Sequence, residues 1–162
     1  MIQVGQKIPS LKLRKVTATG VDEVSTEEFF GGRKVVVVTV PGAFTPVCSN
    51  SHLPGYVAKA DEIKKRGVAE IACVSVNDAH VMRAWAEQQG ATGKVTMLAD
   101  GNAELTRALG LDIDLGVAGM GVRAKRAALL IEDGTVRSIE VEAKPSDVTG
   151  SGADSCLVKL GA

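Results

Sequence analysis

Two unbroken runs of β-branched and small apolar residues constrain the fold of this chain more than any other feature. Residues 35–40 read Val-Val-Val-Val-Thr-Val, and residues 71–76 read Ile-Ala-Cys-Val-Ser-Val. Runs of this kind predict strands that are buried on both faces, as in a parallel sheet. A helix-like segment that Gly67 ends lies between them, so the chain is expected to contain a β–α–β unit whose two strands share one sheet.

Capping residues, turn residues and apolar periodicity predict the other elements. The first part of the chain should form an edge hairpin, from residues 11–16 and a partner after the turn 18–20, and a short helix capped by Ser25 and Glu28. The middle should form a helix over 79–89, a strand over 95–99 and a short helix around 103–109, followed by an irregular glycine-containing loop over 111–122. The last part should form a hairpin of 127–131 with 135–141 and a helix over 154–160. Parallel steps followed by an antiparallel hairpin and a last helix predict an α/β, thioredoxin-like fold with a mixed central sheet flanked by helices.

No repeat, linker or low-complexity tract divides the sequence, so residues 1–162 are expected to form one thioredoxin-like domain. A doubly wound nucleotide-binding fold also begins with a β–α–β unit. Residues 41–46 follow the first buried strand and carry neither a dinucleotide fingerprint nor a P-loop. The glycines of residues 116–121 follow no predicted strand, which favours a flexible loop over a nucleotide site.

Charge and hydropathy exclude several classes of partner. The chain has 19 basic and 19 acidic side chains, a balance that argues against nucleic acid or an anionic membrane as the main partner. No apolar run approaches the roughly 20 residues that cross a bilayer. The first ten residues resemble neither a signal peptide nor a transit peptide, so we expect a cytoplasmic protein, or an organellar one if a transit segment has been removed.

The three cysteines point to thiol chemistry. Cys48, Cys73 and Cys156 are too few for a secreted disulfide scaffold and lack the paired spacing of a zinc site. No metal or other cofactor is predicted.

The segment 41–48, Pro-Gly-Ala-Phe-Thr-Pro-Val-Cys, lies between a buried strand and the next helix. Sites in open α/β sheets form beyond the carboxyl ends of the strands. Thr45 can serve as an N-cap and Pro46 suits the first helical position, which would place Cys48 in the first turn of the helix. Free N–H groups and the helix dipole favour an anion there, so Cys48 is expected to be largely thiolate near neutral pH.

Each of these residues also has a purely structural interpretation. Most free cysteines are small buried hydrophobic residues, and Thr45 alone would be only a cap. The combination of Thr45 and Cys48 at the carboxyl edge of the sheet favours a reactive thiol.

Residues 41–55, PGAFTPVCSNSHLPG, resemble the active-site motif of peroxiredoxins, in particular the type II or fifth-subfamily group. Residues 73–78, the helix with Trp85, residues 98–100 and residues 125–134 follow the same family in order and spacing. The resemblance covers nearly the whole chain. It implies a thioredoxin fold and an antioxidant, thiol-dependent peroxidase that reduces hydrogen peroxide and alkyl hydroperoxides, with peroxynitrite as a further candidate, through a sulfenic acid.

The resemblance also implies roles for individual residues. Cys48 matches the peroxidatic cysteine, Thr45 the threonine that bonds to thiolate and peroxide, and Arg126 the arginine beside the sulfur. Pro41 matches the proline that shields the site from water, and backbone N–H groups near Gly42 and Cys48 would complete a cradle. For the arginine, Arg123 is the competing candidate, and its register relative to residues 128–134 is the poorer match.

Two residues after Cys48 have expected structural effects. Pro54 removes a helical hydrogen bond and predicts a kink, which could ease local unwinding or have no function. His52 is expected to be a hydrogen-bonding group rather than a base, and His80 a surface residue.

The thiol that resolves the sulfenic acid is left open. Animal fifth-subfamily proteins use a cysteine in the loop before the last helix, where this chain has Thr149 or Gly150. Cys156 lies on the predicted last helix, and Cys73 has the spacing of the second cysteine in plant type II proteins but lies within a buried strand. An external thiol, glutathione with glutaredoxin or thioredoxin, is therefore favoured, with Cys156 as an internal alternative. The resemblance further implies a homodimer packed edge to edge.

Two other functions fit the sequence less well. A dithiol oxidoreductase is disfavoured because Cys48 has no Cys-x-x-Cys partner, positions 45 and 51 being Thr and Ser. A binding module or redox-controlled scaffold without catalysis would not need Pro41, Thr45, Cys48 and Arg126 together.

Overall fold

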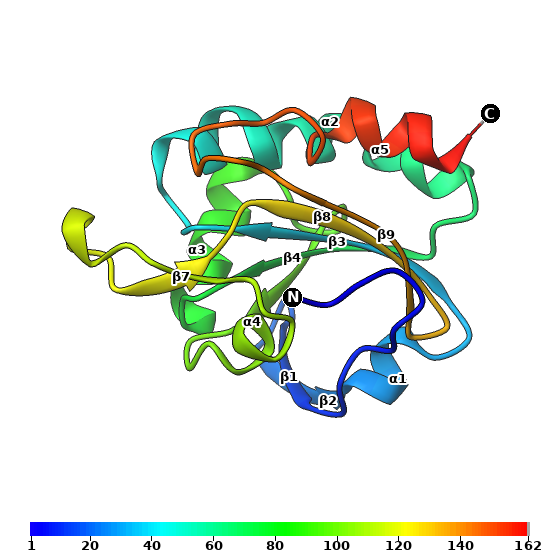
Figure 1. Ribbon diagram of the computed structural model, residues 1–162, viewed down its shortest axis with the longest axis horizontal. Coiled ribbons are helices and arrows are strands. Elements are labelled where there is room, and N and C mark those ends of the chain that lie inside the picture. The colour runs from blue at the N-terminus through cyan, green and yellow to red at the C-terminus, as the bar shows by residue number, and fades with distance from the viewer. Residues whose placement is uncertain (162) are drawn as a thin grey trace.

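A seven-stranded mixed sheet forms the centre of the molecule, as the computed structural model shows for residues 1–161 (Figure 1). Its strand order is β2-β1-β5-β4-β3-β8-β9. The strands are β1 (Lys12–Val16), β2 (Val21–Ser25), β3 (Lys34–Val40), β4 (Glu70–Ser75), β5 (Thr96–Ala99), β8 (Ala127–Glu132) and β9 (Thr135–Val141). The chain has the α/β architecture with a mixed sheet that the sequence predicts.

The two apolar runs form the middle of this sheet. Strands β3 and β4 pair in parallel, with Val38 opposite Cys73, and β5 extends the parallel part beyond β4. Strand β8 pairs antiparallel with the other side of β3. Six of the seven residues of β3 are buried, because helices cover both faces of the sheet. The carboxyl ends of β3 and β4 therefore lie side by side, which fixes where the segment after β3 can form a site.

Helices and apolar side chains make a layer on each face of the sheet. Helices α2 (Leu53–Lys65), α3 (Ala79–Gln89) and α5 (Ala153–Leu160) contribute to one buried cluster with the side chains of β3 and β4 that point their way. Helices α1 (Thr26–Phe30) and α4 (Glu104–Ala108) contribute to the other cluster. Figure 1 shows α2 and α5 along one face of the sheet and α1 and α4 beyond the other. Among residues 1–161, no helix has the length and apolar character needed to cross a membrane.

The predicted helix boundaries agree with the structure where a capping group was recognised. Ser25 accepts a hydrogen bond from the Glu28 N–H at 3.1 Å at the start of α1. Asp78 does the same for the Val81 N–H at 2.9 Å, and Gly90 ends α3 with a left-handed φ of 65°. The hairpin turn between β8 and β9 has positive φ at Asp133 and Gly134, as an Asp-Gly turn requires.

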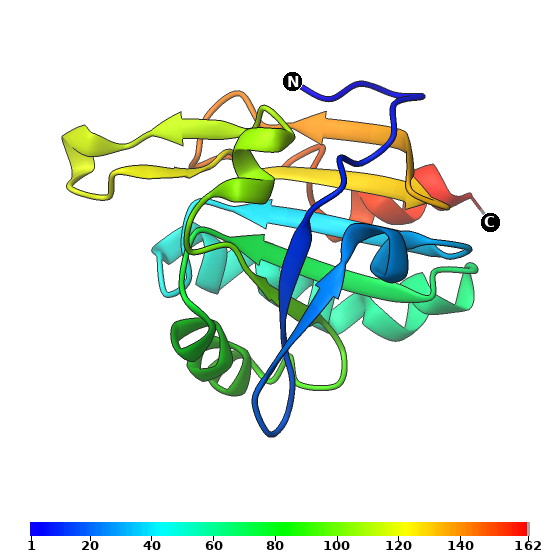
Figure 2. The ribbon, with the colours of Figure 1, turned by 90° about the horizontal axis from the view of Figure 1, so that it is seen from below.

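The prediction of an irregular loop over residues 111–122 is wrong. Strands β6 (Asp112–Asp114) and β7 (Val122–Ala124) pair antiparallel, and a single 3₁₀ turn, η2 (Gly116–Ala118), lies between them. This ribbon projects from the body of the molecule (Figure 2). Gly119 and Gly121 take positive φ and close the ribbon, so these glycines serve the turn. Three-residue strands are too short to produce a recognisable alternating pattern.

The helix that follows Cys48 differs from the expected regular helix. Residues Cys48–His52 form a π-helical turn, η1, before α2 begins at Leu53. The Leu53 N–H donates to the Cys48 carbonyl five residues back. Pro54 has no N–H to donate and its ring would clash with a carbonyl four residues back, which disfavours continuing the regular ladder there. The interruption expected at Pro54 thus takes the form of a π-bulge, a feature frequent at functional sites.

Candidate active site

The segment after β3 is fixed by the loop after the neighbouring strand β4. Pro41, Gly42 and Ala43 are buried. The Ala43 N–H donates to Asn77 Oδ1 at 3.0 Å, and Ser75 Oγ donates to the same oxygen at 2.6 Å. Two adjacent parallel strands thus hold the start of the Cys48 segment, a contact that the sequence did not suggest.

Phe44 turns the chain from this buried loop into the helix. Its φ of 64° is in the left-handed region, which is costly for a residue of this size, and Phe44 is 48% exposed. Strained backbone of this kind persists where the surroundings impose it and is concentrated at functional sites.

Thr45 starts the helix through its backbone rather than its side chain, which corrects the predicted cap. The Thr45 carbonyl accepts from the Ser49 N–H at 2.9 Å. Its hydroxyl donates to the Gly42 carbonyl at 2.7 Å, which ties Thr45 to the loop before the helix. A hydroxyl group is thereby held one helical turn before the sulfur of Cys48.

Arg126 lies directly against Cys48. Arg126 Nη2 is 2.9 Å from Cys48 Sγ, and the two side chains are 2% and 0% exposed. A guanidinium cation at hydrogen-bond distance stabilises a thiolate, and the stabilisation is large where water is excluded. The pairing of these two residues, 78 positions apart in the sequence, turns a buried cysteine into a candidate nucleophile.

The other nitrogens of Arg126 also have partners. Nε donates to the Pro145 carbonyl at 2.8 Å, and Nη1 lies 2.8 Å from His52 Nδ1. His52 Nε2 lies 3.0 Å from the Ser151 carbonyl. A carbonyl only accepts and a guanidinium only donates, so these neighbours require a neutral His52 that carries its proton on Nε2. His52 is thus the hydrogen-bonding group expected from the sequence, and it bonds to the arginine of the site.

The electrostatics of His52 agree with the neutral form. Burial, with a smaller contribution from the nearby Arg126 cation, lowers the pKa of His52 to about 4, although the bond to the Ser151 carbonyl acts in the opposite direction. His80, by contrast, is exposed on α3, as expected.

Arg123, the competing candidate, lies at the rim of the same site but not on the sulfur. Its Nε donates to the Met120 carbonyl at 2.9 Å, and its Nη1 is 3.5 Å from the Pro41 carbonyl. A Cβ atom on Gly42 would lie only 2.9 Å from Arg123 Nη1, so a larger residue at position 42 would push against this arginine. Arg123 therefore packs over Pro41 and Gly42.

The other two cysteines lie in different surroundings. Cys73 is central in β4 with no exposed surface, and burial raises the pKa of its thiol well above the usual range. Cys156 is on α5 and 8% exposed, and burial raises its pKa to about 11 despite a hydrogen bond with Tyr56. All three cysteines are free thiols. The structure therefore brings Arg126, and not a second thiol, to Cys48.

Among residues 1–161, no group of three or more His, Cys, Asp or Glu side chains is arranged to hold a metal ion. The site offers a buried cysteine sulfur with a cationic donor on it and a threonine hydroxyl three residues earlier in the chain.

Comparison with known proteins gives one consistent result. The family model described as Redoxin matches residues 3–157. The chain is 48% identical to Peroxiredoxin-2E-2, chloroplastic, of Oryza sativa subsp. japonica, covering 98% of this chain and 72% of that protein. It matches the crystal structure of reduced Prx3 in complex with H₂O₂ from Vibrio vulnificus with a TM-score of 0.93 and 47% identity, covering 99% of both chains. Peroxiredoxin 5 from Alvinella pompejana matches with a TM-score of 0.85 and 34% identity, covering 99% of this chain and 98% of that one. Other curated relatives include chloroplastic and mitochondrial proteins of Arabidopsis thaliana.

Proposed function

This chain belongs to the Redoxin family and within it to the type II, fifth-subfamily-like peroxiredoxins, which makes it a thiol-dependent peroxidase, and we propose that Cys48 is its peroxidatic residue. The observation that carries this proposal is the 2.9 Å contact between Arg126 Nη2 and Cys48 Sγ. Cys48 is the cysteine of the chain that has a cationic donor on its sulfur and lies at the start of a helix.

The proposed reaction is a two-electron displacement at oxygen. The Cys48 thiolate attacks the terminal oxygen of a hydroperoxide, an S–O bond forms, and the O–O bond breaks. The leaving oxygen takes a proton from solvent and departs as water or an alcohol. Sulfur is oxidised to sulfenic acid while the peroxide is reduced. Hydrogen peroxide and alkyl hydroperoxides are the proposed substrates, with peroxynitrite as a further candidate.

Arg126 and Thr45 are proposed to act on the reacting atoms. The guanidinium keeps the sulfur ionised and donates to the peroxide oxygens as charge moves onto the leaving oxygen. The Thr45 hydroxyl, held by the Gly42 carbonyl, is the second group offered to sulfur and peroxide. Pro41 and the backbone at Gly42 are proposed to line the site and keep it dry, a role that their burial supports.

We propose that the site opens locally during turnover, because Cys48 has no exposed surface in this conformation. Two sparsely populated backbone states flank it, the left-handed Phe44 and the π-helical turn Cys48–His52. Relaxation of either would move the oxidised sulfur away from Arg126 and toward solvent, where a reducing thiol can reach the sulfenic acid, whereas the peroxide reacts while Arg126 still lies on the sulfur.

The reducing thiol is proposed to be external, from glutathione with glutaredoxin or from thioredoxin. Its thiolate would attack the sulfenic sulfur, expel hydroxide as water, and form a mixed disulfide that a second thiol reduces. Cys73 lies between two neighbouring strands, and Cys156 has a raised pKa, so neither favours rapid internal resolution. Cys156 remains the internal alternative, and a stoichiometric Cys48–Cys156 disulfide after one equivalent of peroxide would replace the external thiol.

Three further features are part of the proposal. Residues 1–162 are proposed to fold as one domain, since one sheet carries both buried clusters. A cytoplasmic location is proposed from the sequence, although several relatives are organellar. A homodimer is proposed from the family resemblance, packed near the active site.

The proposed function is tested by peroxide consumption with a panel of thiol reductants: glutathione with glutaredoxin, thioredoxin, and dithiothreitol. The native protein should turn over, Cys48→Ser should lose activity by about 10⁴-fold or more, and Cys73→Ser should retain it. Unchanged turnover in Cys48→Ser would overturn the proposal. Absence of turnover with every reductant would favour a binding module.

A further inference from the structure

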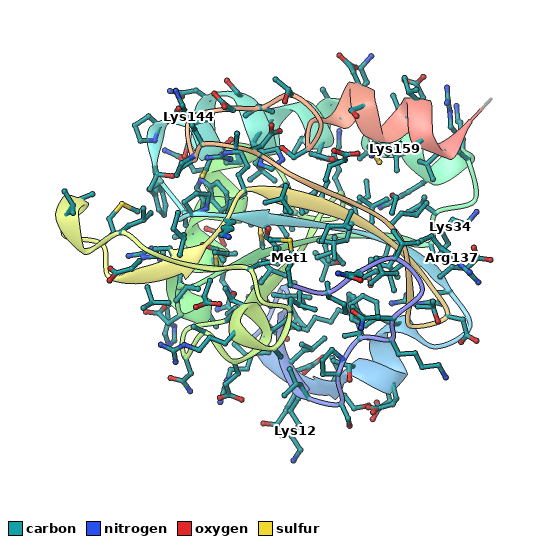
Figure 3. All side chains as sticks on the ribbon, in the orientation of Figure 1. Met1, Lys12, Lys34, Arg137, Lys144 and Lys159 are labelled. Carbon is teal, nitrogen blue, oxygen red and sulfur yellow. The ribbon has the colours of Figure 1, made fainter. Side chains whose placement is uncertain are left out.

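The segment between β9 and α5, residues 142–151, is here called the strap. It contacts the side chains that surround Cys48. Figure 1 shows it in orange, passing from β9 to α5 beside the start of α2, and Lys144, labelled in Figure 3, lies on it. The strap contains no helix or strand. A few main-chain hydrogen bonds, such as that from the Asp147 N–H to the Lys144 carbonyl, and contacts with side chains therefore set its course.

Two carbonyl groups of the strap hold side chains of the active site. The Pro145 carbonyl accepts from Arg126 Nε at 2.8 Å. The Ser151 carbonyl accepts from His52 Nε2 at 3.0 Å and from the Tyr56 hydroxyl at 2.7 Å. Because His52 Nδ1 in turn accepts from Arg126 Nη1, the strap holds the guanidinium that lies on Cys48 directly through Pro145 and indirectly, by way of His52, through Ser151.

A single carboxylate ties the strap down. Glu142 Oε2 accepts from the Thr149 N–H at 2.7 Å and from the Ser151 N–H at 2.9 Å, and its oxygens also accept from both hydroxyl groups of these residues. The Glu142 N–H donates to the Arg126 carbonyl at 2.9 Å, which anchors the first residue of the strap beside the arginine it serves. Burial raises the pKa of this carboxyl, but the bonds from Ser151 and Thr149 outweigh that effect and lower it to about 2.

We propose that Glu142 is a positioning residue for the peroxidase reaction, which fixes the strap so that its carbonyls hold Arg126 and His52 against Cys48. This inference rests on the proposed role of Cys48 and Arg126. Four hydrogen bonds to one carboxylate replace the regular structure that the strap lacks. A long arginine side chain is free to take many rotamers unless its donors are held, and a small misplacement of such a group slows catalysis strongly.

The contacts give Glu142→Ala a specific expected effect. It leaves two N–H groups and two hydroxyls of the strap without their acceptor, so the strap should loosen and Arg126 should leave the sulfur for part of the time. We expect the rate of Cys48 oxidation by hydrogen peroxide to fall about 10- to 100-fold. The fraction of Cys48 present as thiolate at neutral pH, followed by its ultraviolet absorbance, should fall as well. Glu142→Gln keeps one acceptor oxygen and should recover part of both losses.

Glu140→Ala is the matched control, because Glu140 lies two residues earlier on β9 and pairs with Lys159 at the surface. It should leave the oxidation rate and thiolate fraction unchanged, since exposed ion pairs contribute little. Thermal unfolding of each variant checks that the fold is intact. If Glu142→Ala does not fold, the comparison of Glu142→Gln with Glu140→Ala still decides, because only the former should lower the thiolate fraction.

A double-mutant cycle separates this inference from the proposed function. If Glu142 acts through Arg126, Glu142→Ala should slow native protein but have little further effect in an Arg126→Leu background. Equal effects in both backgrounds, or no effect in either, would overturn the positioning role while Cys48→Ser still abolished turnover. If Cys48→Ser retained activity, the proposed function itself would fail.

Discussion

Cys48 and Cys73 have equal burial and very different surroundings. Both are 0% exposed and both belong to the buried cluster under α2, α3 and α5. Cys73 lies in the middle of β4, opposite Val38 on one side and Met97 on the other. Cys48 lies beyond the carboxyl end of β3, at the start of a π-helical turn, with Arg126 Nη2 at 2.9 Å.

The comparison shows that burial alone does not set the chemistry of a thiol. Burial raises the pKa of Cys73 and favours the neutral thiol, and the charge of Arg126, whose donors go to Pro145, His52 and Cys48, opposes this only in part. The same exclusion of water strengthens the interaction of a thiolate with a guanidinium when one is present. Contact with Arg126, and the groups that hold this arginine, thus distinguish the proposed nucleophile Cys48 from the packing residue Cys73.

Removing Arg126 should make Cys48 most like Cys73, a buried thiol with no guanidinium on its sulfur. In Arg126→Leu we expect Cys48 oxidation by hydrogen peroxide to slow about 10²- to 10³-fold, as when one strong transition-state donor is lost. Stopped-flow fluorescence of Trp85, whose Nε1 donates to Ser49 Oγ at 3.0 Å beside Cys48, provides the signal. Arg123→Leu is the matched control and should slow the step only a few-fold, because Arg123 contacts the rim. Equal losses in the two variants would mean that general positive charge, and not the contact with sulfur, activates Cys48.

Acid should protonate His52, which binds the arginine beside Cys48, and should leave the apolar surroundings of Cys73 unchanged. The pKa of His52 falls from 6.5 to about 4 on folding, so the unfolded chain binds a proton that the folded chain excludes. The contribution of neutral His52 to the free energy of unfolding is therefore complete above about pH 6.5. As the pH falls toward 4, this contribution is lost and the free energy of unfolding decreases by roughly 3 kcal/mol. Denaturant unfolding across this range should show the decline in native protein and a shallower one in His52→Gln. Parallel curves for the two proteins would contradict the assignment of a neutral, buried His52.

Replacing Cys73 should have the smallest effect on activity. Cys73→Ser should leave the peroxide reaction within about twofold of the native rate, since Cys73 has no role in the displacement. Its free energy of unfolding should fall by about 1–3 kcal/mol, because a hydroxyl is buried between apolar strands. Peroxide kinetics and denaturant titration of the same sample measure both quantities. A large loss of rate with stability unchanged would instead place Cys73 in the resolving step.

Sequence patterns predicted the parts of the fold that local interactions determine. The buried runs at 35–40 and 71–76 became β3 and β4, and the caps at Ser25 and Asp78 start α1 and α3. The ribbon β6–β7 was missed, because strands of three residues give no periodic signal.

Of the site, the sequence predicted the main residues but not the contacts that hold them. Arg126 was placed near Cys48 by its match to a family motif, and the 2.9 Å contact agrees with that expectation. The π-helical turn was not predicted: Pro54 indicates that the regular helix is interrupted but not by which alternative. The Pro145 and Ser151 carbonyls bind Arg126 and His52, which lie in other segments of the chain, and no residue pattern reveals bonds made by backbone carbonyls.

Locating the first oxidised sulfur shows whether peroxide oxidises the cysteine that Arg126 contacts. The reduced protein is treated with one equivalent of hydrogen peroxide, trapped with a sulfenic acid reagent, and examined by peptide mass spectrometry. We expect to find the trapped sulfenic acid on Cys48, with Cys73 and Cys156 still reduced. Oxidation that begins at Cys73 or Cys156 while Cys48 remains a thiol would contradict this expectation.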